Sequence, residues 1–311
     1  MKVIFMGTPE FAVSALKKLH GDGHEIVLAV TQPDRPRGRG RQVSASPVKK
    51  AAMGLNIPVS QPESIRTVEF LRFVQELQPD VLVVVAFGQI LPKSLLSVPP
   101  VGSINIHASL LPKYRGPAPI QWAIINEEKQ TGVTIMFMDE GLDTGDILLA
   151  QKTDISPDDT TASLYGRLAE MGAELISDTL GRLSAGHIKP VRQDHEQATY
   201  APLLKKSDGL IDWTRPAYSL DAFIRGMSPW PGAFTFYDGR RLKIFRAVPA
   251  RSDVREAPGT VIPGFPDELR VMTGEGALSI LDIQGASGKR LPIRDFLQGN
   301  SIPPGTKLKA S

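Results

Sequence analysis

The feature that most constrains the fold is an uninterrupted apolar run, Val81–Ala86, that directly follows Pro79 and Asp80. A strand that is apolar along its whole length has both faces covered, which is typical of parallel sheets. Shorter apolar runs and helical patterns alternate around it. Strands are expected at Val3–Met6, Glu25–Val30, Ser103–Ile106 and Val133–Met138, and helices after Pro9, from Ser46-Pro47, and over Val68–Leu77, Ile120–Asn126 and Thr160–Leu183. This alternation predicts an α/β fold, a mostly parallel sheet with helices on both faces.

The pattern changes after Gly186, where helical periodicity is lost. Residues 189–206 are rich in Lys, Arg and Pro and predict a basic linker. Beyond it, two hairpins are expected, over 234–245 around Asp238-Gly239 and over 269–283. Asp-Gly favours tight hairpin turns, and short strands at this spacing predict a small sandwich or barrel. The expected organisation is a catalytic domain at 1–188, the linker at 189–206 and a β-barrel domain at 207–311.

Several function classes are disfavoured by what the sequence lacks. There is no cysteine, which excludes disulfides, thiolate metal sites and cysteine nucleophiles. The first strand is followed by Gly7-Thr8-Pro9-Glu10, so the later glycines of the dinucleotide fingerprint are missing, and a nicotinamide or ATP enzyme is disfavoured. No apolar run approaches the ~20 residues of a membrane-spanning helix. We therefore expect a cytoplasmic protein with no membrane partner, and no spacing of its histidines predicts a metal site.

Polar residues gather where two expected strands end. Sites in open parallel sheets lie beyond the carboxyl ends of the strands. Side chains alternate along a strand, so Asn105 and His107 share a face, where an amide and an imidazole could donate to a developing oxyanion. A carboxylate from the loop 139–146 could orient and charge the imidazole. The residues alone leave Asp139, Asp143 and Asp146 as candidates, and the alternative is a histidine that only fixes a loop.

Arginine occupies alternate positions of one glycine-containing loop. Its members are Arg35, Arg37, Arg39 and Arg41, with Gly38 and Gly40 between them. Arginine binds phosphate and stacks on bases, and clustered cations repel one another without an anionic partner. The loop therefore predicts RNA binding, although a solvated loop without a partner is the alternative. Further basic residues could form a second RNA-binding surface or merely a solvated face: Lys205, Lys206, Arg240, Arg241, Lys243 and Arg246.

Three longer stretches carry a resemblance to the formyl-tetrahydrofolate-dependent formyltransferases. They are Asn105–Pro112, Tyr114–Trp122 and Asp139–Asp146. With Gln32–Gly40, the sequence is similar in particular to the branch of that family that acts on methionyl-tRNA. The resemblance is specific from residue 1 to about residue 200 and continues more weakly to the end. Phe87 stands where the family commonly has a tyrosine.

The resemblance implies a Rossmann-like catalytic domain followed by an OB-like β-barrel. It implies that Asn105, His107 and Asp143 form the catalytic triad, and that a folate-binding stretch consists of Ser109, Leu110, Leu111 and Pro112. The implied substrates are 10-formyltetrahydrofolate and methionyl initiator tRNA, with no metal and with the protein acting as a monomer.

The resemblance also implies contacts to the RNA. Arg39 is the first choice for a contact to the acceptor stem, with Arg37, Arg41 and Lys206 beside it. The rival within the family is a folate-dependent formyltransferase for a small amine such as a nucleotide sugar. The arginine loop argues against that rival, because a small substrate needs no RNA-docking surface.

Overall fold

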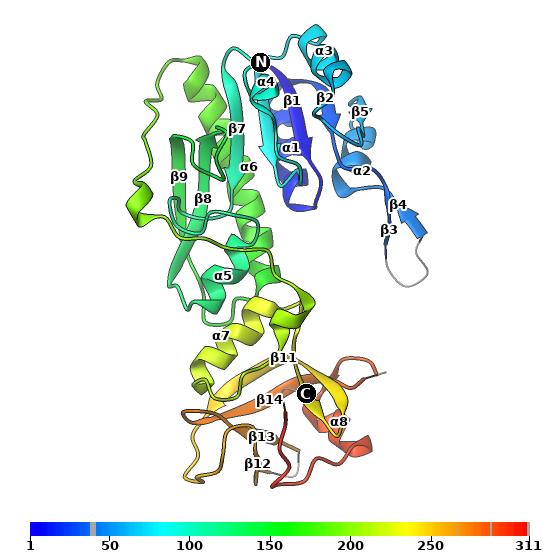
Figure 1. Ribbon diagram of the computed structural model, residues 1–311, viewed down its shortest axis with the longest axis vertical. Helices are drawn as coiled ribbons and strands as arrows, with labels where there is room; N and C mark the ends of the chain where they lie inside the picture. The colour runs from blue at the N-terminus through cyan, green and yellow to red at the C-terminus, as the bar shows by residue number, and fades with distance from the viewer. Residues whose placement is uncertain (38–41, 266, 287, 310–311) are drawn as a thin grey trace. The chain divides into compact units, whose positions relative to one another are not determined.

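The computed structural model describes residues 1–37, 42–265, 267–286 and 288–309 (Figure 1). The chain forms two compact units. The first comprises Met1–Pro119, Thr131–Thr153 and Tyr165–Ala201, and the second comprises Ile120–Gln130, Asp154–Leu164 and Pro202–Ser311. Each unit therefore contains segments that are distant in the sequence.

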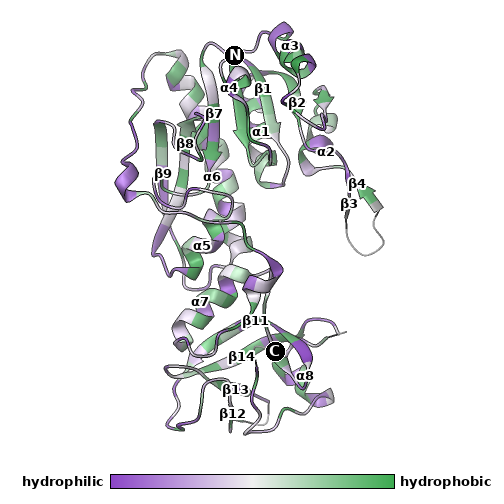
Figure 2. Cartoon of the chain, in the orientation of Figure 1, coloured by the Kyte–Doolittle hydropathy of each residue, from purple (hydrophilic) through white to green (hydrophobic). Residues whose placement is uncertain are grey.

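The first unit is built on a seven-stranded sheet with the order β5-β2-β1-β6-β7-β8-β9. The strands are β1 (Lys2–Gly7), β2 (Glu25–Val30), β5 (Val59–Ser60), β6 (Val81–Val85), β7 (Gly102–His107), β8 (Gln130–Phe137) and β9 (Ile147–Asp154). Pairing is parallel from β5 through β7, and β7 pairs antiparallel with β8. The prediction of a mostly parallel sheet is confirmed, and β1 and β2 are predominantly hydrophobic (Figure 2).

Helices cover both faces of this sheet. They are α1 (Phe11–Gly21), α2 (Pro47–Gly54), α3 (Val68–Glu76), α4 (Lys93–Leu96) and α6 (Thr161–Ser184). Ile4 and Met6 of β1 pack in one core cluster with Phe70 of α3 and Leu95 of α4. On the opposite side α1 and α6 meet, where the Phe11 N–H donates to the Tyr165 hydroxyl at 2.7 Å.

Local sequence signals explain where these helices begin. The Ser46 hydroxyl accepts the N–H of Lys49 at 3.0 Å, and Pro47 follows at the first helical position. Thr67 caps α3 in the same way through the N–H of Phe70. Side-chain caps of this kind satisfy backbone donors that the first turn leaves unpaired.

The second unit contains a curled antiparallel sheet with the order β10-β11-β14-β13-β12, and β15 pairs with β14. Its strands are β10 (Ala233–Tyr237), β11 (Arg240–Ala250), β12 (Val261–Ile262), β13 (Leu269–Met272), β14 (Ala277–Gln284) and β15 (Leu291–Pro292). Both expected hairpins are present, and Asp238 and Gly239 turn with positive φ angles of 48° and 68°.

The C-terminal segment completes this half-barrel. Lys309 exchanges backbone hydrogen bonds with Phe236 of β10, each at 3.0 Å. The Val261 N–H of β12 donates to the Thr306 carbonyl at 2.7 Å. The segment thus bridges the first and last strands of the sheet path, which leaves fewer edge groups unpaired.

Three elements differ from the sequence-based expectations. Helix α7 (Ala217–Met227) lies where helical periodicity was expected to be lost. It is buried on most sides, and its polar stripe is narrow, with only Tyr218, Asp221 and Arg225 not buried. A second short helix, α8 (Ile293–Gly299), also follows Gly186, so that expectation was wrong. Strand β9 was not expected from the sequence: the apolar residues Ile147–Ala150 are followed by polar ones without alternation, and only Leu148 of the strand is buried. Helix α5 (Pro119–Ile125) and the ladder of β3 (Arg35–Arg37) with β4 (Gln42–Ser44) complete the main elements.

Within the described residues, no helix combines the length and the apolar character needed to cross a bilayer.

Candidate active site

Strand β7 ends in the two polar residues that the sequence placed on one face. Asn105 lies centrally in the sheet, between Val84 of β6 and Met136 of β8, and is half-buried. His107 is buried, with 6% of its surface exposed. Its Nε2 lies 2.9 Å from the carbonyl oxygen of Tyr114. Because a carbonyl oxygen can only accept, Nε2 carries the hydrogen and Nδ1 is the nitrogen that remains for chemistry.

A carboxylate faces that second nitrogen. Asp143 Oδ2 lies 3.6 Å from His107 Nδ1, and the Asp143 side chain is 15% exposed. This distance is too long for a hydrogen bond but allows an ion pair when the imidazole is protonated. The same Oδ2 accepts the backbone N–H of Gly116 at 2.7 Å. Asp143 is therefore held at its side chain while it faces His107.

The other two aspartates of this loop have different environments. Asp139 accepts the N–H of Gly141 at 2.9 Å and the Thr144 hydroxyl at 2.6 Å, so it shapes the turn. Asp146 is exposed. The geometry therefore favours Asp143 among the three candidates, because it alone is paired with the imidazole.

Two buried polar residues behind the Asp143 loop were not assigned a role from the sequence. The amide nitrogen of Gln193 donates to the carbonyl oxygens of Asp143 at 2.9 Å and Gly145 at 2.7 Å. Its amide oxygen accepts from Arg115 at 3.2 Å (Nε) and 2.6 Å (a terminal nitrogen). Gln193 lies within the segment that was interpreted as a linker, and no local pattern distinguishes it. Arg115 belongs to the stretch Tyr114–Trp122 that carried the family resemblance.

The expected folate-binding stretch lies against β8. The Thr134 hydroxyl donates to the Ser109 carbonyl at 2.7 Å and accepts the N–H of Leu111 at 3.1 Å. The Ser109 hydroxyl donates to the Lys113 carbonyl at 2.6 Å. Ser109 and Leu111 are buried, whereas Leu110 and Pro112 are half-buried. The stretch is thus rigidly anchored and leaves two apolar side chains partly accessible.

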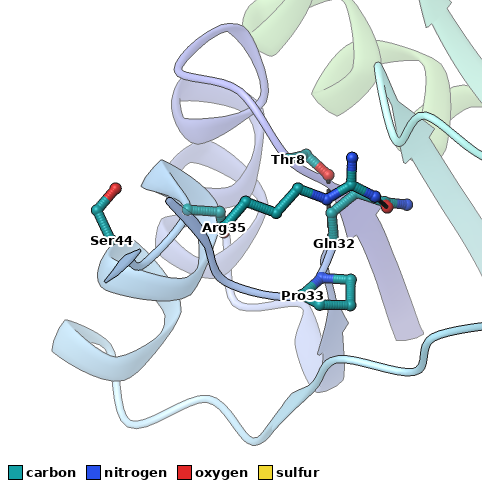
Figure 3. Close-up of a pocket in the computed structure, with 6 residues that line it drawn as sticks. Thr8, Gln32, Pro33, Arg35 and Ser44 are labelled. Carbon is teal, nitrogen blue, oxygen red and sulfur yellow. Dashed lines mark hydrogen bonds between the residues drawn. The ribbon is translucent and has the colours of Figure 1, made fainter. Parts of the chain in front are cut away.

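A small pocket lies at the carboxyl ends of β1 and β2, at the foot of the β3–β4 ladder (Figure 3). Its volume is about 150 Å³. The lining residues are Thr8, Gln32, Pro33, Arg35, Ser44 and Ser46. The Arg35 side chain extends toward Gln32, where its terminal nitrogen lies 3.4 Å from the amide oxygen. Among the described residues, the buried Gln32 Nε2 has no hydrogen-bond partner.

The wall of this pocket is held by Asp34. Its carboxylate accepts from Lys49 Nζ at 2.6 Å and from Gln61 Nε2 at 2.7 Å. These two hydrogen bonds, that of Lys49 first, hold the pKa of Asp34 below its ordinary value. The buried hydroxyls of Thr31 and Ser46 also pair at 2.7 Å. The pocket is therefore preorganised, and Arg35 remains exposed at its mouth.

The expected RNA contacts are only partly within the described residues. Arg39 and Arg41 lie outside them, and Arg37 is described only as the last backbone position of β3. Lys206 is exposed at the start of the short helix η2 (Lys206–Gly209) of the second unit. On β11 of that unit, the Arg241 guanidinium lies 3.9 Å above the Phe234 ring.

Among the residues that the structure describes, no cluster of three or more histidine or carboxylate side chains is arranged to hold a metal ion.

Comparison with known families gives matches over both units. The formyl transferase family model matches residues 1–180, and the formyl transferase C-terminal domain model matches residues 203–301. The methionyl-tRNA formyltransferase of Caldanaerobacter subterraneus subsp. tengcongensis is 51% identical over 310 residues, 99% of this chain and 100% of the relative. The enzyme of the same name from Citrifermentans bemidjiense is 50% identical over 308 residues, 99% of this chain and 96% of that relative.

Solved structures with lower identity share the fold. An N-formyltransferase from Helicobacter canadensis, in complex with folinic acid and dTDP-3-aminofucose, has a TM-score of 0.69 at 18% identity, covering 94% of this chain and 100% of its own. HypX from Aquifex aeolicus, in complex with tetrahydrofolic acid, has a TM-score of 0.65 at 18% identity. That match covers 96% of this chain, which spans about half (47%) of HypX.

Proposed function

The chain belongs to the formyl transferase family, and from that premise we propose that it transfers the formyl group of 10-formyltetrahydrofolate to the α-amino group of methionyl initiator tRNA in the cytoplasm. The observation that carries this proposal is sequence identity: the chain is 51% and 50% identical, over 99% of its length, to two enzymes named methionyl-tRNA formyltransferase. The pairing of His107 with Asp143 at the end of a central strand supplies the chemistry.

The nucleophile in this reaction is the α-amine of the bound methionine. It attacks only when neutral, and simple α-amines titrate near about 7.7–8.0. Its attack forms a carbon–nitrogen bond and moves charge onto the formyl oxygen. The bond to the folate nitrogen then breaks, and the proton lost by the amine is replaced on that nitrogen. No protein nucleophile is required.

The residues of the site would stabilise the charge on the formyl oxygen. Asn105 can donate an amide hydrogen from the end of β7. His107 would donate from Nδ1, because its Nε2 is occupied by the Tyr114 carbonyl. Asp143 stands 3.6 Å from Nδ1, which is too far for a hydrogen bond. A hydrogen carried by Nδ1 would therefore remain available to the oxyanion. Asp143, directly or through water, would accept the proton of the amine.

The folate would bind beside this pair. We propose that Ser109, Leu110, Leu111 and Pro112 line its site, since the first and third are fixed to β8 and the other two are partly accessible. The reaction needs no metal, because charge is stabilised by hydrogen-bond donors.

The RNA would dock through basic residues of both units. We propose that Arg37, Arg39 and Arg41 of the arginine loop contact the RNA. The β3–β4 ladder lies beside a pocket lined with donors. Arg35 and Ser44 can contact a phosphate there, and arginine forms strong charge-assisted hydrogen bonds with phosphate. We propose that Lys206 of the linker 189–206 and the β10–β11 hairpin contribute further contacts to the RNA phosphates. In this proposal residues 1–188 form the catalytic domain and residues 207–311 form the RNA-binding domain.

The proposal is tested by following the transfer of a labelled formyl group from the folate to an acceptor amine. The protein is mixed with formyl-labelled folate and one acceptor: methionyl initiator tRNA, methionyl elongator tRNA or an amino-sugar nucleotide. Label on the initiator-bound methionine is expected. Label on the amino sugar alone would instead identify the small-amine branch, whose fold this chain shares. A size-exclusion run of the same preparation tests the expected monomer.

A further inference from the structure

We infer that Gln193, oriented by Arg115, is the positioning residue that sets Asp143 against His107. The inference rests on the proposed role of Asp143 as the catalytic carboxylate. Gln193 is 4% exposed and Arg115 is 2% exposed, so neither is expected to contact a substrate directly. Both act through the backbone of the loop that carries Asp143.

The amide of Gln193 can adopt only one orientation in this network. Its oxygen faces two N–H groups of Arg115, which can only donate. Its nitrogen faces the carbonyl oxygens of Asp143 and Gly145, which can only accept. A glutamine fills all four contacts, whereas no charged or apolar side chain of similar size could do so. The two carbonyls lie on either side of Thr144, so one side chain fixes the turn that follows Asp143.

The loop needs such support because Asp143 has a left-handed backbone, with φ of 54°. A residue with a Cβ persists in this region only where its surroundings hold it. Two contacts do so here: the N–H of Gly116 holds the carboxylate, and Gln193 holds the carbonyl. Arg115, which orients Gln193, is adjacent to Gly116, so both contacts depend on one short segment.

That segment is itself firmly placed. The N–H of Arg115 donates to the Thr199 carbonyl at 2.8 Å, and its carbonyl accepts the N–H of Ala201 at 2.7 Å. A terminal nitrogen of Arg115 also lies 3.2 Å from His195 Nδ1. Among the described residues, the hydrogen-bond partners of the guanidinium are thus an amide and an imidazole, so no carboxylate competes with Gln193 for it. The orientation of the amide therefore depends directly on Arg115.

The substitution Gln193→Glu separates positioning from folding. A glutamate keeps the size and pairs with Arg115, so the buried segment should remain folded. It also sets a carboxylate oxygen against two carbonyl oxygens, which should push the Asp143 loop away. Misplacement of a catalytic group by about 1 Å can cost on the order of 10²-fold in rate. We expect kcat to fall by about 10–100-fold, with KM for the tRNA and the melting temperature nearly unchanged.

The matched control is Gln284→Glu. The Gln284 amide nitrogen also donates to a backbone carbonyl, that of Gly288 at 2.8 Å, but in the second unit. The Gln284→Glu variant loses the same kind of hydrogen bond and gains the same charge as Gln193→Glu, but it should leave kcat unchanged. A kcat for Gln193→Glu within twofold of the unaltered protein would overturn the inference. So would a parallel loss of kcat, tRNA affinity and melting temperature, which indicates a merely structural role.

A second measurement does not depend on the reaction. The backbone N–H of Gly116 donates a hydrogen bond to the Asp143 carboxylate, so its rate of hydrogen exchange with solvent reports the position of that side chain. Exchange should accelerate in Gln193→Glu but not in Gln284→Glu, and equal rates would overturn the inference. If the unaltered protein transferred no formyl group to any tRNA, the proposed function would fail, while this exchange experiment would still decide the role of Gln193.

Discussion

The N–H of Gly116 donates to the Asp143 carboxylate at 2.7 Å, across 27 positions of sequence. Gly116 can do this because it adopts φ of 114°, in a region that strongly favours glycine, and because its Cα passes close to the Ala201 carbonyl. The placement of the carboxylate therefore depends on a position without a side chain.

Replacing Gly116 by alanine should affect both stability and turnover. A Cβ there would lie 2.9 Å from the Ala201 oxygen, in addition to the unfavourable φ. We expect a loss of about 1–3 kcal/mol of unfolding free energy and a lower kcat. Urea unfolding and single-turnover transfer measure the two effects. The control is Gly181→Ala in α6, where nothing lies within 4 Å of the added carbon. It should stabilise the helix by about 0.5–1 kcal/mol, and equal effects at both sites would refute the argument.

Removal of either proposed oxyanion donor should slow the chemical step. Loss of one such donor typically costs about 10²–10³-fold in turnover. We expect Asn105→Ala and His107→Ala to fall in that range while tRNA binding is retained. Single-turnover rates at saturating folate, compared with filter-binding affinities, test this expectation. Near-normal rates in both variants would remove these residues from the mechanism.

The pocket at the foot of the β3–β4 ladder predicts a salt-dependent RNA contact. If Arg35 binds one phosphate, Arg35→Ala should reduce the slope of log affinity against log salt by about 0.7–0.9. The control is Arg66→Ala, an exposed arginine elsewhere in the first unit. Affinities at several salt concentrations provide the slopes. Identical slopes for the two variants would place the RNA away from this pocket.

His24 predicts a pH dependence of stability. Burial, followed by the positive N-terminus, lowers the pKa of its imidazole from the ordinary 6.5, while Asp22 opposes the shift. The folded state therefore disfavours the protonated ring. The contribution of His24 is fully present above about pH 6.5 and is lost as the pH falls toward the lower folded pKa. Urea unfolding between pH 5 and 7.5 should show a weaker acid-side decline for His24→Gln than for the unaltered protein. A steeper decline in the variant would reverse the assigned sign.

The sequence predicted those elements whose signals are local. Strand β6 has five buried residues in succession and stood out as an apolar run. Helix α2 was marked by its capping serine and proline, and the β10–β11 hairpin by Asp238-Gly239. Strand β9 was missed because it is largely exposed, and α7 because it is largely buried.

The site shows the same division between local and distant signals. Asn105 and His107 share a strand, so their common face followed from alternation alone. The choice of Asp143 over its neighbours rested on family resemblance, because the contacts that distinguish it come from Gly116 and Gln193. Arg115 and Gln193 are 78 positions apart, and no local pattern relates them. The catalytic and RNA-binding roles of these residues stay predictions until the variants are measured.

The strand-like segment Thr306–Lys309 also has a practical consequence. It provides hydrogen-bond partners for Phe236 and Val261, which belong to the first and last strands of the second sheet. A polypeptide shortened before Thr306 would present two open edges to other molecules, a known route to aggregation. An affinity tag at the C-terminus should not disturb the hydrogen bonds of Thr306–Lys309, so a spacer should separate the tag from Lys309.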